Sequence, residues 1–384
     1  MVHVMQLANF FGPTSGGIRV ALEQLGLRYV EQGHRTTLVV PGAADGIEMS
    51  GNRTVIQLRS PLVPGLGGYR AIVARRSVRA AVAAFQPDVI ELSDKTTLVG
   101  VARWARRRGV PTVLVSHEHT LGVVDQALGV GRVAAPAIAR YNRRLARHVD
   151  AVVCASDYAA SEFGPDVAPA QLVHRCPLGV DLTAFRPAVG PRRVGPVRIV
   201  TAVRLSPEKL PDTIVATSRH LVDLGIDHEY RVFGEGPERA RLERSAGGLP
   251  IVFEGYCADR TALARAMADA DVGVAPGPHE TFGLAAIELL ACGTPVVVPD
   301  HGALSEMVDV RTGVVAAAGD GRAFAAGVAA LVRGERCVQR RLARDRAGRF
   351  SWERAADRFL AVHAAVAADA CSWRTPAWTT AAAH

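Results

Sequence analysis

Two long series of short apolar runs, each run followed by an amphipathic stretch, cover most of the chain. The first series predicts strands at 2–8, 36–41, 54–58, 88–92, 111–116 and 149–154. The second predicts strands near 197–203, 229–233, 251–254, 272–275, 295–298 and 314–315. Strands that alternate with helices form parallel sheets with helices on both faces. We therefore expect an α/β fold in which two Rossmann-like, doubly wound domains face each other across a cleft.

A segment rich in proline and glycine separates the two series. It predicts a linker at 187–196 between an N-terminal domain at 1–186 and a C-terminal domain at 197–351. The apolar stretch at 352–369 predicts a final helix that packs back on the N-terminal domain. Residues 370–384 predict a flexible tail because they lack periodicity. At 384 residues, the chain is long enough for both domains to bury a core.

The composition favours a protein of a reducing compartment. No run approaches the roughly 18 apolar residues of a membrane span. The first residues run directly into a predicted strand, so we expect no secretory signal. The six cysteines are scattered and form no paired motif, which predicts reduced thiols and no structural zinc. A cytoplasmic location follows, with peripheral attachment to the cytoplasmic face of the plasma membrane as one option.

Basic charge gathers in the first half of the chain. Residues 1–187 carry a net charge of +7 and residues 188–384 a net charge of +1. The excess favours contact with an anionic membrane surface, although solvated helix faces explain it equally well. Nucleic-acid binding is disfavoured because few aromatic residues are interleaved with the arginines. Three predicted helical segments hold the excess: Arg70, Arg75, Arg76 and Arg79; Arg103, Arg106, Arg107 and Arg108; Arg140, Arg143, Arg144 and Arg147.

Two carboxylates, Glu280 and Glu288, lie eight positions apart around a turn that begins an apolar helix. This spacing places one acid just before the helix N-terminus and the other about one turn inside it. The backbone N–H groups of Phe282, Gly283 and Leu284 would then face the same space. Helix N-termini bind phosphate, and carboxylates suit sugar hydroxyls. The segment therefore predicts a site for a sugar joined to a phosphate.

Charged side chains at other predicted strand ends fit the same ligand. Arg204 and Lys209 lie five apart across a Ser-Pro turn and can close on a diphosphate, although a surface loop would look similar. They would neutralise the charge that develops on a departing nucleoside diphosphate. His117 follows an apolar strand and points toward the cleft, where it can bond a sugar hydroxyl or make a structural hydrogen bond. His117 and His119 are only two apart with no further cluster, so we expect no metal site.

Glycines and one aromatic residue complete the set of candidate donor contacts. Gly16 and Gly17 follow the first strand, where paired glycines let a backbone approach a ligand or simply make a tight turn. Gly234 lies in another strand-to-helix turn, and Tyr256 ends a strand where a base can pack. The first of these turns lacks the GxGxxG pattern, which disfavours a nicotinamide dinucleotide site.

Taken together, these motifs resemble the retaining glycosyltransferases of family 4, which have the GT-B fold. The resemblance covers about residues 2–365 and follows the order of the family's motifs. It implies that Glu280 contacts the donor hexose and Glu288 the ribose, and that Arg204 and Lys209 bind the diphosphate. One departure is Leu178, where the family's Pro-Asn-Gly-Val-Asp segment has asparagine.

The resemblance also implies roles on the opposite wall of the cleft. Gly16 and Gly17 match the glycine loop near the donor phosphate and the acceptor, and His117 matches the active-site histidine near the sugar. The residues expected to act in catalysis are His117, Arg204, Lys209 and Glu280. No carboxylate nucleophile is evident, so front-face transfer is expected, without a metal or cofactor.

Within the family, the chain is most similar to actinobacterial α-mannosyltransferases of the phosphatidylinositol mannoside pathway. The segments 6–13, 91–94 and 275–283 carry this similarity. It implies GDP-mannose as donor and a glycolipid acceptor such as phosphatidylinositol dimannoside. Three alternatives stay open: a UDP-sugar donor with a small-molecule or polysaccharide acceptor, a nucleotide-sugar 2-epimerase, and a non-catalytic protein that binds sugar nucleotides.

Overall fold

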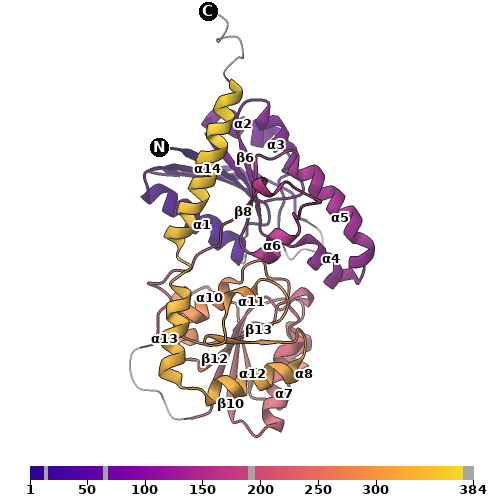
Figure 1. The fold of residues 1–384 in the computed structure, drawn as a ribbon, viewed down its shortest axis with the longest axis vertical. Coiled ribbons are helices and arrows are strands. Elements are labelled where there is room, and N and C mark those ends of the chain that lie inside the picture. The colour runs from indigo at the N-terminus through magenta and orange to yellow at the C-terminus, as the bar shows by residue number, and fades with distance from the viewer. Residues whose placement is uncertain (13–15, 64–67, 189–194, 375–384) are drawn as a thin grey trace, which may run out of the picture.

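The structure, a computed structural model, describes residues 1–12, 16–63, 68–188 and 195–374, and it has two halves stacked along its long axis (Figure 1). The first half contains an eight-stranded sheet in the order β3-β4-β2-β1-β5-β6-β7-β8. Neighbouring strands are parallel except β3 and β4, which form a hairpin. The strands are β1 (His3–Leu7), β2 (Arg35–Gly42), β3 (Gly46–Ser50), β4 (Arg53–Arg59), β5 (Val89–Leu92), β6 (Thr112–Ser116), β7 (Ala151–Cys154) and β8 (Val173–Arg175).

Helices fill the gaps between these strands, as the alternation predicts. In the first of them, Leu22, Leu25 and Tyr29 share one face, and all three are buried against the sheet. The helices of this half are α1 (Gly17–Glu31), α2 (Arg75–Phe85), α3 (Val99–Arg106), α4 (Thr120–Leu128), α5 (Gly131–Ala146) and α6 (Asp157–Ser161), with the 3-10 turn η1 (Ala170–Leu172).

The second half contains a six-stranded, wholly parallel sheet in the order β11-β10-β9-β12-β13-β14. Its strands are β9 (Val197–Ala202), β10 (His228–Phe233), β11 (Ile251–Gly255), β12 (Val272–Val274), β13 (Val296–Pro299) and β14 (Gly313–Ala316). Its helical elements are η2 (Pro207–Lys209), α7 (Asp212–Asp223), α8 (Arg239–Ser245), α9 (Arg260–Asp269), α10 (Leu284–Ala291), α11 (Leu304–Met307), α12 (Gly321–Arg333) and α13 (Arg336–Ala347).

The predicted α/β fold with two doubly wound sheets is confirmed, and each predicted strand is present with small shifts at its ends. The prediction missed β3 and β8. All five residues of β3 are exposed, so the strand is too short and too polar outside Ile47 and Met49 to be recognised, and β8 is only three residues long.

The last helix, α14 (Trp352–Arg374), leaves the second half and runs along the first half beside α1 (Figure 1). It is five residues longer than predicted, so residues 370–374 of the predicted tail belong to this helix. The alanine-rich stretch before residue 370 favours helix, and the next proline is Pro376. Residues 375–384 of the predicted tail and 189–194 of the predicted linker lie outside the described residues.

The chain crosses between the halves a second time where α14 begins. Val180 N donates to Phe350 O at 3.0 Å, and a Cβ at Gly179 would lie only 2.3 Å from Trp352 N, so glycine is required there. Leu178 is buried in the apolar cluster that continues from one half into the other. This location explains why an apolar side chain suits position 178.

Candidate active site

The N-termini of α1 and α10 face each other between the two halves. A Cβ at Gly17 would lie 3.7 Å from Leu284 Cδ1, whereas a Cβ at Gly16 would meet no atom within 4 Å. Within the described residues, no protein acceptor bonds the backbone N–H groups of Phe282, Gly283 and Leu284. The structure therefore brings the predicted glycine pair and the predicted phosphate cradle together. Pro13, Thr14 and Ser15 of the glycine loop lie outside the described residues.

A glycine at the start of α10 sets the direction of this helix. Gly283 has φ +87°, and a Cβ there would lie 2.1 Å from Leu304 Cδ2. The Phe282 side chain is buried and packs edge-on against Phe350, with ring centroids 5.9 Å apart. Phe282 therefore offers the cleft only its backbone.

Lys209 and Glu280 form an ion pair in the second half, where η2 lies against α4 of the first half. Lys209 Nζ lies 2.8 Å from Glu280 Oε1, and both side chains remain partly exposed. Lys209 ends the 3-10 turn η2, whose Lys209 N donates to Ser206 O, so the Ser-Pro turn predicted from the sequence aims the lysine. A Cβ added at Gly277 would lie 3.2 Å from Lys209 Cδ. A larger residue at position 277 would therefore crowd the lysine side chain.

Arg204 contacts the opposite half of the molecule. Its Nη2 donates to the Tyr69 hydroxyl, and its guanidinium carbon lies 5.3 Å from the centroid of the Tyr69 ring. The turn at Gly234 supports the segment that carries Arg204. Gly234 has φ +143°, and a Cβ there would lie 1.8 Å from Val203 O. Gly234 thus packs against the segment that carries Arg204, one of the two residues predicted to bind the diphosphate.

His117 lies directly after β6 and bridges the two halves. Its Nε2 is 3.0 Å from Ser93 Oγ, and its carbonyl accepts from Thr281 Oγ1 at 2.7 Å. Burial lowers the pKa of His117 to about 4, Glu91 opposes this shift, and Lys95 reinforces it. The imidazole is therefore neutral at pH 7 and can both donate and accept a hydrogen bond.

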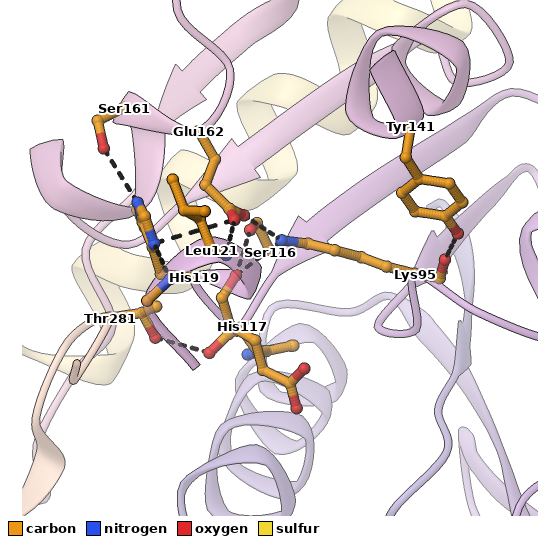
Figure 2. A network of polar contacts seen from close by, with 12 residues as sticks. Lys95, Ser116, His117, His119, Leu121, Tyr141, Ser161, Glu162 and Thr281 are labelled. Atoms are coloured by element: carbon orange, nitrogen blue, oxygen red, sulfur yellow. Dashed lines mark hydrogen bonds and ion pairs between the residues drawn. The ribbon is translucent and has the colours of Figure 1, made fainter. Parts of the chain in front are cut away.

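A polar network that the sequence analysis missed surrounds the segment after His117 (Figure 2). Lys95 Nζ lies 2.7 Å from Glu162 Oε2 and donates to Glu118 O at 2.7 Å. The second oxygen of Glu162 accepts from Leu121 N at 2.9 Å. The only sequence signal for this network is that Lys95 is one of two lysines among 45 basic residues.

Next to this network, histidines and a tyrosine pack along the seam between the halves. His119 stacks on Tyr158 with centroids 4.2 Å apart, and the Tyr158 hydroxyl is 3.0 Å from His279 Nδ1. His301 meets both Tyr158 and His279 edge-on. Burial lowers the pKa values of His119 and His279. The lowered pKa values favour neutral rings at His119 and His279, which limits charge repulsion at the seam.

The seam is also closed by contacts between polar groups. Glu306 of α11 accepts from the backbone N–H groups of Asp157 and Tyr158 at the start of α6, at 3.0 and 2.8 Å. Ser156 Oγ donates to Thr281 O at 2.6 Å, one residue from Glu280. The cleft residues of the two halves are thus held in direct contact.

Glu288 lies deeper than Glu280 and has its own cation. It is 5% exposed, and its Oε1 accepts from Arg260 Nη2 at 2.6 Å. Burial raises the pKa of this carboxyl, and Arg260 opposes the rise. Arg260 also lies 4.8 Å from the Phe185 ring centroid. Tyr256, the predicted base contact, is 47% exposed after β11.

Among the residues that the structure describes, no group of three or more histidine, cysteine or acidic side chains is arranged to hold a metal ion. Within these residues, no helix is both long and apolar enough to span a membrane.

Two family models match this chain. Residues 16–179 match a model described as "Glycosyl transferase 4-like domain", and residues 196–334 match "Glycosyl transferases group 1". The chain is 43% identical, over 95% of its length and 97% of the relative's, to the "GDP-mannose-dependent alpha-(1-6)-phosphatidylinositol dimannoside mannosyltransferase" of Mycobacterium tuberculosis. It is 30% identical, over 95% of its length and 88% of the relative's, to the "D-inositol 3-phosphate glycosyltransferase" of Geodermatophilus obscurus.

Solved structures share the fold at lower identity. Sucrose-phosphate synthase from Thermosynechococcus elongatus matches with a TM-score of 0.79 and 22% identity, over 96% of this chain and all of that one. Anabaena HepE in complex with UDP and glucose matches with a TM-score of 0.73 and 17% identity, over 95% of this chain and all of that one. The chain therefore belongs to glycosyltransferase family 4 and has the GT-B fold.

Proposed function

We propose that this glycosyltransferase moves mannose from GDP-mannose to a hydroxyl group of a phosphatidylinositol mannoside, with retention of the anomeric configuration. The observation that carries the proposal is the 43% identity, over nearly the whole of both chains, to an enzyme named for that reaction. The cleft supports it, since Lys209 and Glu280 lie beside the facing N-termini of α1 and α10.

The donor diphosphate fits between the two helix N-termini. There the unbonded N–H groups of 282–284 and the cations of Arg204 and Lys209 stabilise negative charge. As the bond from the sugar's C1 to the diphosphate oxygen breaks, that oxygen takes the electron pair. It then accepts the proton from the acceptor hydroxyl, which attacks from the same face of the sugar. Charge stabilisation of this kind is the largest contribution that a preorganised site makes.

Three further residues orient the sugar nucleotide. Glu280 accepts hydrogen bonds from the hexose hydroxyls, and Glu288 accepts from the ribose with the oxygen that Arg260 leaves open. His117, held by Ser93 through Nε2, presents Nδ1 to the hexose; within the described residues, no protein group bonds Nδ1. Both halves thus contribute to one site, which couples catalysis to their contact.

A donor and acceptor screen tests this proposal. The purified protein is assayed with GDP-mannose, UDP-glucose and UDP-N-acetylglucosamine, each with phosphatidylinositol dimannoside or D-inositol 3-phosphate. We expect transfer only from GDP-mannose to the glycolipid. Preference for a UDP-sugar with D-inositol 3-phosphate would instead favour the alternative function, transfer from a UDP-sugar to a small-molecule acceptor. The 30% identity to a D-inositol 3-phosphate glycosyltransferase suggests this acceptor. Release of a free epimerised sugar without an acceptor would contradict both.

Peripheral attachment to an anionic membrane is the second part of the proposal. Most residues of the arginine clusters lie on or directly after α2, α3 and α5, which line one side of the first half (Figure 1). Arg70 is the exception to the helical prediction, because it forms a β-bridge with Leu62 before α2. Arg79 and Arg108 both contact the Trp104 ring, and Arg106 donates to Arg147 O, so the clusters adjoin. Each arginine near an anionic surface contributes roughly 1 kcal/mol.

Co-sedimentation with vesicles tests the membrane attachment. We expect binding to vesicles that contain phosphatidylglycerol, weaker binding at high salt, and none to neutral phosphatidylcholine. Arg107→Glu should weaken the binding, whereas Arg333→Glu, which changes another exposed arginine at the end of α12, should not. Binding that depends on neither anionic lipid nor salt would contradict the proposal.

A further inference from the structure

Lys95 is a lysine in a chain that otherwise uses arginine. Of its 45 basic residues, only Lys95 and Lys209 are lysine. Lys209 belongs to the donor site. Lys95 lies in the loop between β5 and α3, in the other half, and its side chain is only 10% exposed. A charge so removed from water needs specific partners.

The partners of Lys95 all hold one short segment of the chain. Its ammonium lies 2.7 Å from Glu162 Oε2, 2.7 Å from the carbonyl oxygen of Glu118 and 5.3 Å from the Phe163 ring centroid. Glu162, whose side chain is 2% exposed, accepts from Leu121 N with its other oxygen. The Lys95–Glu162 pair thus bonds the segment 118–121 at both ends, through the carbonyl of Glu118 and the N–H of Leu121 (Figure 2).

A second contact fixes the backbone of Lys95 itself. The Tyr141 hydroxyl of α5 donates to Lys95 O. Glu162 Oε1 also lies 3.9 Å from His119 Nδ1, which caps the start of α4 by accepting from Gly122 N. Every residue from 118 to 122 is therefore tied, directly or through one neighbour, to the Lys95–Glu162 pair.

The segment 118–121 follows directly after His117, the histidine of the proposed active site. The His117 carbonyl accepts from Thr281 Oγ1, and residue 281 is adjacent to Glu280. A shift of the segment 118–121 would therefore move His117 relative to Ser93 and to the sugar-binding carboxylate. Misplacement by about 1 Å can cost a reaction roughly 10²-fold.

We propose that Lys95 is a positioning residue for sugar transfer, which acts with Glu162 to hold the segment 118–121 so that His117 faces the donor sugar. This inference rests on the proposed function. Lysine suits the role because its compact ammonium bonds two oxygens at 2.7 Å in a narrow, buried space. The planar fork of arginine is broader and matches a single carboxylate instead.

Kinetics of Lys95→Met and Glu162→Gln test the proposal. The glutamine keeps an oxygen for Leu121 N but loses the charge that holds Lys95. We expect each variant to lower kcat for mannose transfer about 10- to 100-fold while the KM for GDP-mannose changes less than about twofold. Arg28→Met is the matched control, because Arg28 pairs with Glu31 at 2.5 Å at the far end of α1. It should keep the wild-type kcat.

A spectroscopic readout separates positioning from stability. The ring signals of His117 are assigned by their absence from His117→Asn. Lys95→Met should raise the midpoint of the His117 titration, because Lys95 lowers this pKa and Glu91 stays in place. A role limited to stability would lower the melting temperature yet leave kcat unchanged at 25 °C, which would overturn the proposal.

Two further outcomes also support or contradict the positioning role of Lys95. If Lys95→Met does not fold, a wild-type kcat in Glu162→Gln overturns the proposal and a reduced kcat with unchanged KM supports it. If the wild-type protein transfers no mannose from any donor, the proposed function fails. In that case, a change in the titration midpoint or the ring signals of His117 in Lys95→Met still shows whether the Lys95–Glu162 pair influences His117.

Discussion

Gly122 provides the sharpest test of whether contact between the halves is needed for activity. It lies in the first turn of α4, in the first half of the molecule. A Cβ at this position would lie 2.6 Å from the Tyr158 hydroxyl and 2.6 Å from His279 Nδ1. His279 belongs to the second half and neighbours Glu280. The substitution Gly122→Ala therefore inserts a methyl group where the halves meet.

The size of the effect follows from what the methyl group displaces. It forces apart the Tyr158–His279 contact of 3.0 Å, whose net worth is about 0.5–1.5 kcal/mol. Overpacking of this kind costs about 1–3 kcal/mol. Tyr158 lies in the same half as Gly122, so only the approach to His279 is relieved when the halves separate. The part of the cost that arises at His279 therefore falls on the arrangement in which the halves touch, and a penalty of up to 1–3 kcal/mol lowers its population by up to roughly 5- to 150-fold.

The same substitution should leave the fold intact. Alanine is favoured over glycine in helices by about 1 kcal/mol, so the melting temperature should stay the same or rise. We therefore expect kcat/KM for mannose transfer to fall about 5- to 150-fold in a protein of undiminished stability. Small-angle X-ray scattering with GDP-mannose should show a larger radius of gyration than for the wild type.

Gly247→Ala is the control for the glycine substitution. Gly247 lies far from the seam, and a Cβ there would make only an ordinary contact with Arg244 O at 3.5 Å. It should change neither activity nor radius. Wild-type kcat/KM in Gly122→Ala would refute the reasoning that the observed contact between the halves is the catalytic arrangement.

Three other outcomes can be measured directly. Lys209→Ala should lower kcat about 10²- to 10³-fold, as expected for loss of one group that stabilises the leaving diphosphate, and near-normal turnover would exclude that role. Gly283→Ala should lower the free energy of unfolding in urea by about 2–5 kcal/mol, because φ +87° and the 2.1 Å approach to Leu304 add strain to overpacking; an unchanged midpoint would contradict this. His117 has a folded-state pKa of about 4, below its ordinary value of 6.5, so the unfolded chain takes up a proton first and stability falls as the pH drops from about 6.5 to about 4. His117→Asn should flatten the melting temperature over this range, and an unaltered slope would show that His117 is not buried as a neutral ring.

Much of the fold was predictable because burial on both faces of a parallel sheet leaves a strong signal. The apolar runs at β1, β5, β6, β7, β9 and β13 are buried along their whole length, or nearly so, and each was predicted from the sequence. In contrast, β3 is exposed at every residue and is formed only by pairing with β4. Its existence depends on a partner strand rather than on its own pattern.

The candidate site was predictable where function depends on the end of a strand or helix. His117, Arg204 and Glu280 each follow a buried strand, and parallel strands place such residues at one edge of a sheet. Lys95 and Tyr69 could not be found in this way. Their roles arise from contacts with residues 67 and 135 positions away, which no local pattern encodes.

The long-range contacts change how donor binding has to be understood. Neither Arg204 nor Lys209 is an isolated cation, because Tyr69 contacts Arg204 and Glu280 pairs with Lys209. If the donor binds as proposed, its diphosphate must compete for both, and the net gain is smaller than the sum of its new hydrogen bonds. Tyr69 belongs to the first half and Arg204 to the second, so this exchange changes a contact between the halves. Binding of the donor and the arrangement of the two halves are thus thermodynamically coupled, and an effect on one must appear in the other.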